Sequence, residues 1–430
     1  MARIDNLTNF LTDVAVAIKD KKGITETITP ANFDTEIASI ETGGNSYKIE
    51  DGRYFFYQGA RLSELDNIAA VSAFKDCSSM FSQTRNKTTI NVKNLDMSHA
   101  TKIDGMFQGC FELTNLDFSS WNTPNLTSMR GVFNGDSKLK TINFKNVDTS
   151  KVTDMSSLFL GCSALTNLDI STFNTSNTTS LAQMFSDCSA LTALDLSHFD
   201  TSNVTNLSQM FNTCKALQSV NLSSFNTNKV TDITNLFYYC QALTSLDLSH
   251  FNVENVNRCG SAFARCSGLT SLNLSGWNMT KMTDMSYMFQ GCSKLTELDL
   301  SGFRTSNVTT LQQTFAECTQ LTELDLSHFD TSNVTNLNQT FSACYGLTKL
   351  DLSGWDTSKV TNYAGTFMSC KNLQELDIRN FDFTKASSYS SVFSSIPADC
   401  LIIVKDDTAK DWVLARRSDF TNVKTVAELA

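Results

Sequence analysis

The sequence predicts an α/β repeat solenoid, a right-handed stack of short parallel strands and short helices with a period of 26 residues. Three observations predict this fold class. Phenylalanine recurs every 26 residues without any insertion. Cysteine occupies one fixed slot of the same period, and each period carries a leucine motif with strand spacing. A period of about 20 to 50 residues is typical of stacked units that share one continuous core.

Two columns of side chains define the predicted stack. The phenylalanines are Phe81, Phe107, Phe133, Phe159, Phe185, Phe211, Phe237, Phe263, Phe289, Phe315, Phe341, Phe367 and Phe393. The cysteines are Cys110, Cys162, Cys188, Cys214, Cys240, Cys266, Cys292, Cys318, Cys344 and Cys370, and Asp136 takes their slot once. No cysteine pair has the C-x-x-C spacing of metal ligands. We therefore expect buried free thiols that pack as small hydrophobic side chains.

The period 191–216 illustrates the expected strand. Leu191, Leu194 and Leu196 have the spacing L-x-x-L-x-L. The last part of this motif alternates with the strand period of two, which turns Leu194 and Leu196 inward and Asp195 outward. Short strands of this kind, stacked from one period to the next, form a parallel sheet.

A turn and a short helix are expected to follow the strand. Residues 200–203, Asp-Thr-Ser-Asn, have side chains that bond to their own backbone, which is typical of a turn. Thr205 stands where a helix N-cap would. Leu207, Met210 and Phe211 then follow at helical spacing. The sequence therefore predicts one or two helical turns in each period.

These periods resemble the leucine-rich-repeat-like units of bacterial surface proteins called BspA-like, with the pattern L-T-x-L-D-L-S-x-F-D-T-S-x-V-T-x-M-x-x-M-F-x-x-C. The resemblance covers residues 68–400 and implies a stacked repeat in a surface protein. In the better-known leucine-rich repeats, the ninth position is an asparagine that forms a buried ladder. Here that slot holds Trp121, Phe173, Phe199, Phe225, Phe251, Trp277, Phe303, Phe329, Trp355 and Phe381. The curvature of the horseshoe type therefore does not carry over.

Residues 1–44 lie outside the repeat, and we predict a helical segment for attachment or oligomerisation. A heptad seam with spacings of 3, 4, 3 and 4 residues is formed by Ile4, Leu7, Leu11, Val14 and Ile18. Two heptads are marginal as an independent coiled coil, so a packed amphipathic helix is the alternative. The segment resembles the N-terminal part of tail and baseplate-associated proteins in phages of Gram-positive bacteria. That resemblance implies attachment to virion structural proteins.

Both ends of the repeat region are predicted to carry caps, because a solenoid must cover its terminal turns. Within residues 45–67, the alternation from Tyr47 to Tyr57 around Asp51-Gly52 predicts a hairpin. Residues 401–430 are predicted to form the C-terminal cap. Its expected elements are a strand at Leu401–Val404, a helix at Thr408–Arg416 and a closing strand at Val423–Val426.

An acidic strand face is the main candidate binding surface. The outward strand slot holds Asp117, Asn143, Asp169, Asp195, Asn221, Asp247, Asn273, Asp299, Asp325, Asp351 and Asp377. Unit charges at the ~4.8 Å spacing of strands repel by roughly 1 kcal/mol in bulk water. Hydration and hydrogen bonds from threonine and serine on neighbouring turns are one explanation of how the repulsion is offset. A bound cation or a hydroxyl-rich ligand is the other.

The ligand interpretation concentrates on the C-terminal half, where three glutamates flank the aspartates. The candidate ligand-binding residues are Glu297, Asp299, Glu323, Asp325, Asp351, Glu375 and Asp377. The hypothesis predicts that calcium raises the melting temperature by neutralising this strip. No other cofactor is expected.

Composition and motifs argue against several other functions. The net charge of −10 disfavours a nucleic-acid partner, and no run of about 18 apolar residues predicts membrane insertion. His198, His250 and His328 share a slot but never on adjacent turns, so no metal site is predicted. No Ser-His-Asp order, G-x-S-x-G elbow or phosphate-binding glycine loop is present. We therefore predict no catalytic residues and no enzyme activity.

The leading hypothesis is a phage virion component, assembled in the bacterial cytoplasm, that presents the solenoid to a host cell-surface protein or glycan. The lack of an export signal favours it over the alternative, a bacterial cell-surface adhesin of the BspA-like type. A homo-oligomer fits the short heptad seam. A glycosidase that uses paired carboxylates is the third interpretation, but equivalent aspartates in many periods indicate a repeat rule rather than one tuned pair.

Overall fold

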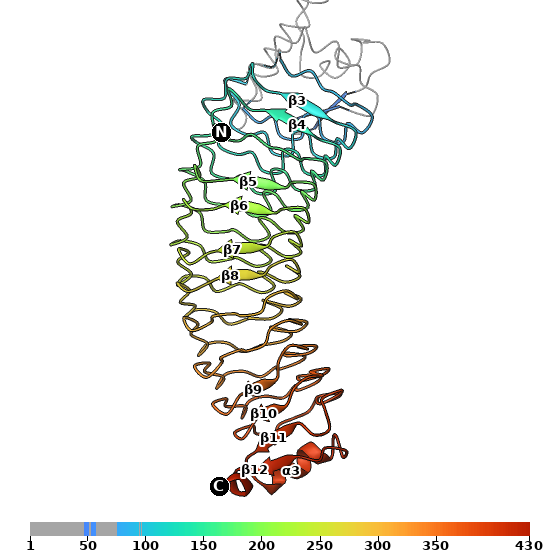
Figure 1. The fold of residues 1–430 in the computed structure, drawn as a ribbon. Helices are drawn as coiled ribbons and strands as arrows, with labels where there is room; N and C mark the ends of the chain where they lie inside the picture. The colour runs from blue at the N-terminus through green and yellow to red at the C-terminus, as the bar shows by residue number, and fades with distance from the viewer. Residues whose placement is uncertain (1–46, 51–52, 57–74, 94, 96) are drawn as a thin grey trace, which may run out of the picture. The chain divides into compact units, whose positions relative to one another are not determined.

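The structure is a computed structural model that describes residues 47–50, 53–56, 75–93, 95 and 97–430. The chain divides into two compact units, with the boundary between Thr178 and Thr179. Within each unit, turns of 26 residues stack on one another and their short strands pair in parallel (Figure 1). The predicted parallel solenoid is therefore confirmed.

The described residues of unit 1 include a hairpin and a parallel pair of strands. Strands β1 (Tyr47–Glu50) and β2 (Arg53–Phe56) pair antiparallel with Glu50 opposite Arg53, which confirms the predicted hairpin. Its turn residues lie outside the described part. Strands β3 (Asn115–Asp117) and β4 (Thr141–Asn143) pair in parallel. Whether the hairpin caps the first repeat stays a prediction.

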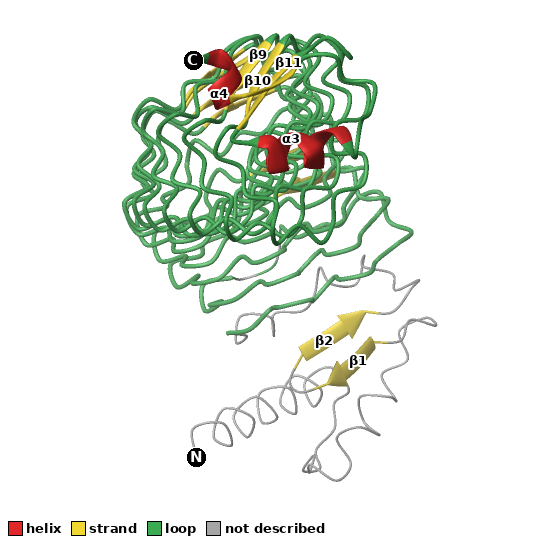
Figure 2. Ribbon diagram, turned by 90° about the horizontal axis from the view of Figure 1, so that it is seen from below, coloured by secondary structure: helices red, strands yellow, loops and turns green. Residues whose placement is uncertain are grey.

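Unit 2 holds the remaining elements. Two parallel pairs are β5 (Ala193–Asp195) with β6 (Ser219–Asn221) and β7 (Ser245–Asp247) with β8 (Ser271–Asn273). A four-stranded sheet has the order β12 (Val423–Thr425), β11 (Leu401–Val404), β10 (Glu375–Asp377) and β9 (Lys349–Asp351). Helices α3 (Asp407–Leu414) and α4 (Val426–Leu429) belong to the C-terminal end, which Figure 2 shows.

The phenylalanine column is the centre of each core. From Phe185 to Phe393, successive rings of unit 2 stack with centroids 5.1–6.1 Å apart and planes within 10°. From Phe81 to Phe159, the rings of unit 1 do the same at 5.2–5.9 Å. All of these rings are buried. The rings face one another rather than solvent, as the stacking prediction requires.

The prediction of a short helix in each period is wrong. In the period that contains Phe211, the N–H groups of Leu207, Gln209, Phe211 and Thr213 donate to carbonyls of the next turn at 2.7–3.0 Å. The alternate N–H groups close short turns, for example Met210 N–H to the Leu207 carbonyl at 3.2 Å. This segment is a ladder of linked turns, in which the backbone bonds between periods instead of along a helix.

Left-handed residues explain why the chain forms this ladder. Gln209 and Thr213 have φ of 58° and 61°. Every residue with positive φ in the described part falls in one of these two slots. A left-handed residue interrupts the succession of right-handed dihedrals that a helix needs. Its own N–H bonds to a carbonyl of the neighbouring period, and the N–H that follows it closes a short turn within the same period. The apolar spacing of the segment stays the same.

The cysteine column consists of free thiols, as predicted. All thirteen cysteines of the chain are buried and unpaired in disulfides. In unit 2, the column thiols donate to the carbonyl of the phenylalanine 29 residues earlier at 3.0–3.2 Å. Burial raises the pKa of Cys266 and Cys318 to about 12, so these thiols stay protonated at neutral pH.

Residues 401–430, the predicted C-terminal cap, contact the last ring of the apolar column of unit 2. Strand β11 has the predicted bounds, and helix α3 overlaps the predicted helix Thr408–Arg416. Strand β12 ends at Thr425 instead of Val426, because Val426 begins helix α4. The Trp412 ring of α3 stacks on Phe383 with centroids 3.8 Å apart. It also meets the edge of Phe393, the last ring of the column, at 6.3 Å. Aromatic side chains of residues 401–430 therefore lie against the end of the column, and the capping role of this segment stays a prediction.

Candidate functional site on the strand face

The outward strand slot is built by one local device. Asp195 Oδ1 accepts the N–H of Ser197 at 3.0 Å, and Asp299 Oδ1 accepts the N–H of Ser301 at 2.9 Å. The same bond recurs at other aspartates and asparagines of the slot. We expected donors on neighbouring turns, but these donors belong to the same turn. The chain bends directly after the strand, which brings the second N–H back to the side chain.

These bonds keep the strand-face carboxylates ionised. Hydrogen bonds from the serine two residues later lower the pKa of Asp117, Asp195, Asp247, Asp299, Asp325 and Asp351. A donor that bonds to the charged form favours that form. The aspartates are therefore fixed acceptors at neutral pH.

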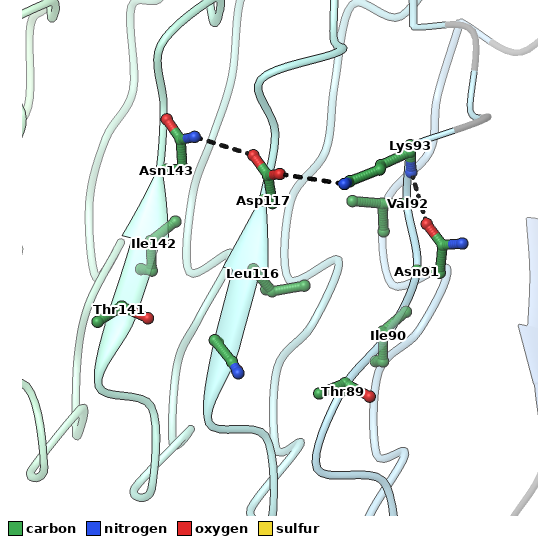
Figure 3. Close-up of a pocket in the computed structure, with 11 residues that line it drawn as sticks. Thr89, Ile90, Asn91, Val92, Lys93, Leu116, Asp117, Thr141, Ile142 and Asn143 are labelled. Carbon is green, nitrogen blue, oxygen red and sulfur yellow. Dashed lines mark hydrogen bonds and ion pairs between the residues drawn. The ribbon is translucent and has the colours of Figure 1, made fainter.

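A hollow of about 400 Å³ lies on the strand face of unit 1 (Figure 3). Three successive turns line it with Thr89, Ile90, Asn91, Val92, Lys93, Asn115, Leu116, Asp117, Thr141, Ile142 and Asn143. Sequence reasoning missed this site because the first of these turns lacks the leucine motif. The alternation of polar and apolar residues from Thr89 to Lys93 is the signal that could have found it.

Polar side chains in the hollow are held to one another across the turns. Asn143 Nδ2 donates to Asp117 Oδ1 at 3.0 Å, and Lys93 Nζ lies 3.6 Å from Asp117 Oδ2. Val92 and Leu116, 1% and 4% exposed, pack beneath them. Lys93 and Asp117 offset each other's charge, and the remaining polar lining consists of amides and hydroxyls. This chemistry suits a neutral polar ligand more than an ion.

Among the described residues, the predicted acidic strip of unit 2 has one part without ion pairs and one part in which the acids pair with cations. Glu297, Asp299, Glu323 and Asp325 lie exposed on two successive turns, and no ion pair in the described part involves them. Asp351 is also exposed and lies opposite Asp377.

The last turns of the strip carry cations as well as acids. Glu375 pairs with Lys349 at 2.8 Å. Asp377 is buried and pairs with Arg379. The uncompensated acid is therefore confined to the four residues of the two earlier turns, and ligand binding by the strip stays a prediction.

Calcium binding by these four carboxylates is testable by thermal unfolding. Millimolar calcium is expected to raise the melting temperature by about 2 °C over a sample with chelator, because it relieves roughly 1 kcal/mol of repulsion. A Glu297→Gln, Glu323→Gln double variant should lose this response. Identical melting curves with calcium and with chelator would refute the hypothesis.

The described part contains no cluster of three or more His, Cys, Asp or Glu side chains placed to hold a metal. His250 and His328 each bond through Nε2 to a carbonyl of the preceding turn, at 3.0 and 2.7 Å. No helix among the described residues is long and apolar enough to cross a membrane. The predicted attachment residues Ile4, Leu7, Leu11, Val14 and Ile18 lie outside the described part.

The chain matches the model of a protein family described as Mycoplasma protein of unknown function, DUF285. Its model matches five overlapping stretches, residues 75–193, 127–242, 180–299, 214–323 and 292–400. No curated protein sequence matches the chain significantly.

Several solved structures are similar to the chain at low identity. A leucine-rich repeat protein from Eubacterium ventriosum is 16% identical, with a TM-score of 0.34, over 83% of this chain and 93% of that one. The pneumococcal vaccine antigen PcpA is 14% identical, with a TM-score of 0.34, over 82% and 77%. The leucine-rich repeat protein of T. pallidum is 12% identical, with a TM-score of 0.25, over 66% and 91%.

Proposed function

The chain belongs to the DUF285 family, whose model covers residues 75–400, and from this premise we propose that it is a non-catalytic binding protein. The observation that carries the proposal is the strand face. Its polar side chains repeat at each turn, and those of Asp195, Asp299 and Asp325 are exposed and held in place by local hydrogen bonds before any ligand arrives. Such preorganisation lowers the entropy lost on binding.

The chemistry of the titratable groups supports the non-catalytic assignment. A glycosidase needs one carboxyl with a raised pKa beside an ionised one. On the strand face the shifted aspartates have lowered pKa values. Within the described residues, a raised carboxyl pKa occurs at Asp136, which is fully buried. The thiols are buried as well.

We place the protein at a bacterial cell surface, as the BspA-like resemblance implies. The phage virion remains the alternative, and it rests on residues 1–44, which lie outside the described part. Antibodies raised against the whole protein would separate the two locations. We expect them to label intact cells that express the natural gene, whereas label on purified virions and none on cells would favour the phage alternative.

The hollow of unit 1 is expected to bind a neutral, hydroxyl-rich surface ligand. The probe is an array of immobilised glycans, together with intact host cells. For a glycan that the wild type binds on the array, we expect an Asn115→Ala, Thr141→Ala double variant to bind at least tenfold more weakly than the wild type. This corresponds to a loss of about 1.4 kcal/mol of binding free energy. Asn134→Ala, on the turn ladder of the same unit, is the matched control and should bind normally. Equal binding by all three proteins would exclude the hollow as the site.

A further inference from the structure

The cysteine slot has one hydrogen-bonding requirement that recurs along the stack. In unit 1, Cys110 Sγ donates to the Phe81 carbonyl at 3.1 Å, and Cys162 Sγ donates to the Phe133 carbonyl at 3.2 Å. Both carbonyls belong to a phenylalanine 29 residues earlier. Both thiols are fully buried. The slot is therefore a closed position whose side chain donates a hydrogen bond to a buried carbonyl.

Asp136 occupies this slot between the two thiols. It is fully buried, and its Oδ1 accepts the N–H of Cys110 at 2.8 Å. That N–H also lies 3.1 Å from the Phe107 carbonyl, so the carboxyl group sits beside this carbonyl. The other oxygen, Oδ2, is buried without a hydrogen-bond partner. By the register of the column, Phe107 supplies the carbonyl that a thiol at position 136 would contact.

A carboxylate does not suit this position, because an ionised carboxyl group can only accept hydrogen bonds. Burial of a charge with no compensating cation is costly. In the described part, the titratable side chains that interact electrostatically with Asp136 are the thiols of Cys110 and Cys162. Neither of them can supply a positive charge.

We infer that Asp136 is a neutral carboxylic acid in the folded protein, that its Oδ2–H donates to the Phe107 carbonyl in place of a thiol, and that this proton makes unit 1 sensitive to pH. In agreement with this geometry, burial raises the pKa of Asp136 to about 8. The group ordinarily titrates near 3.8, as it does in the unfolded chain.

The direction of the pH dependence follows from proton linkage. Between about pH 4 and pH 8 the folded state holds a proton on Asp136 that the unfolded state has lost. Stability from this proton is complete below pH 4 and is lost as the pH rises to 8. Each pH unit in this window lowers the folding equilibrium constant tenfold, which is the expected contribution of one proton.

The test compares urea unfolding of the full-length wild type, Asp136→Asn and Asp136→Cys at pH 5, 6 and 7. The folding constant of the wild type, divided by that of either variant, is expected to fall about 100-fold from pH 5 to pH 7. Asp136→Cys restores the residue type of the column. It provides the comparison with the wild type if the asparagine variant does not fold. Asp148→Asn is the matched control, because hydrogen bonds from Ser150 lower the pKa of this exposed acid. The folding constant of the wild type, divided by that of Asp148→Asn, should therefore stay constant from pH 5 to pH 7.

Infrared spectroscopy gives a second readout that a purely structural role would not change. The carbonyl stretch of a protonated carboxylic acid should be present in the wild type at pH 6 and absent from Asp136→Asn. Parallel stability profiles for wild type and both variants, or the lack of this band in the wild type, would overturn the inference.

Discussion

Replacement of Phe263 by alanine is expected to destabilise unit 2 by roughly 3–5 kcal/mol, the usual cost of removing a buried phenylalanine ring. The ring is fully buried and stacks on Phe237 at 6.1 Å and on Phe289 at 5.8 Å. It also meets the indole of Trp277 at 5.7 Å. Each turn is stabilised mainly by its two neighbours, so one cavity weakens two interfaces of the stack.

Urea unfolding followed by circular dichroism would measure this loss, and hydrogen exchange would locate it in the turns between Phe237 and Phe289. Tyr345→Ala is the surface control, because this ring is 37% exposed and contacts Lys371 at 5.1 Å. It should cost about 1 kcal/mol or less. If both variants lost the same stability, the phenylalanine column would not be the centre of the core.

Replacement of Trp412 by alanine is expected to cost about 3 kcal/mol, near the lower end for large aromatic residues because the side chain is only half-buried. The indole stacks on Phe383 with centroids 3.8 Å apart, and the Arg416 guanidinium lies over the indole, 3.8 Å from its ring centroid. Its loss uncovers the edge of Phe393, the last ring of the column.

Exposure of the uncovered column end should be visible as binding of a hydrophobic dye and as faster proteolysis of residues 401–430. Leu429→Ala, also in the cap but 49% exposed, should leave both unchanged. A Trp412→Ala protein as stable as the wild type, with no added dye binding, would mean that the cap does not seal the stack.

Several elements could be predicted from the sequence because their signals are local or strictly periodic. The spacing of Leu194 and Leu196 around Asp195 predicted a strand. Strand β5 forms there, with Leu194 buried and Asp195 exposed. Residues 401–404 and 407–414 likewise form the predicted strand and helix of the cap. The free-thiol column could be predicted for the same reason. The cysteine spacing matches the repeat, and it does not match the spacing of metal ligands or of a disulfide framework.

The helix in each period could not have been distinguished from a turn ladder, because Leu207, Met210 and Phe211 have the same spacing in both. The choice depends on carbonyls of the next turn, such as Thr234, which accepts the Gln209 N–H at 2.8 Å. The hollow around Asn115 and Asp117 likewise depends on how three turns lie beside one another.

By itself, the sequence determined the period, the identity of the two buried columns, the strand slots and the cap elements, since these follow from side-chain spacing along the chain. Tertiary structure decided the backbone path between the strands, the hollow of unit 1, and the surroundings of Asp136. The physical reason is that a backbone donor left unpaired in its own segment takes its partner from the adjacent turn. A buried carboxyl group likewise takes its properties from its surroundings, which here include a backbone N–H 26 residues away.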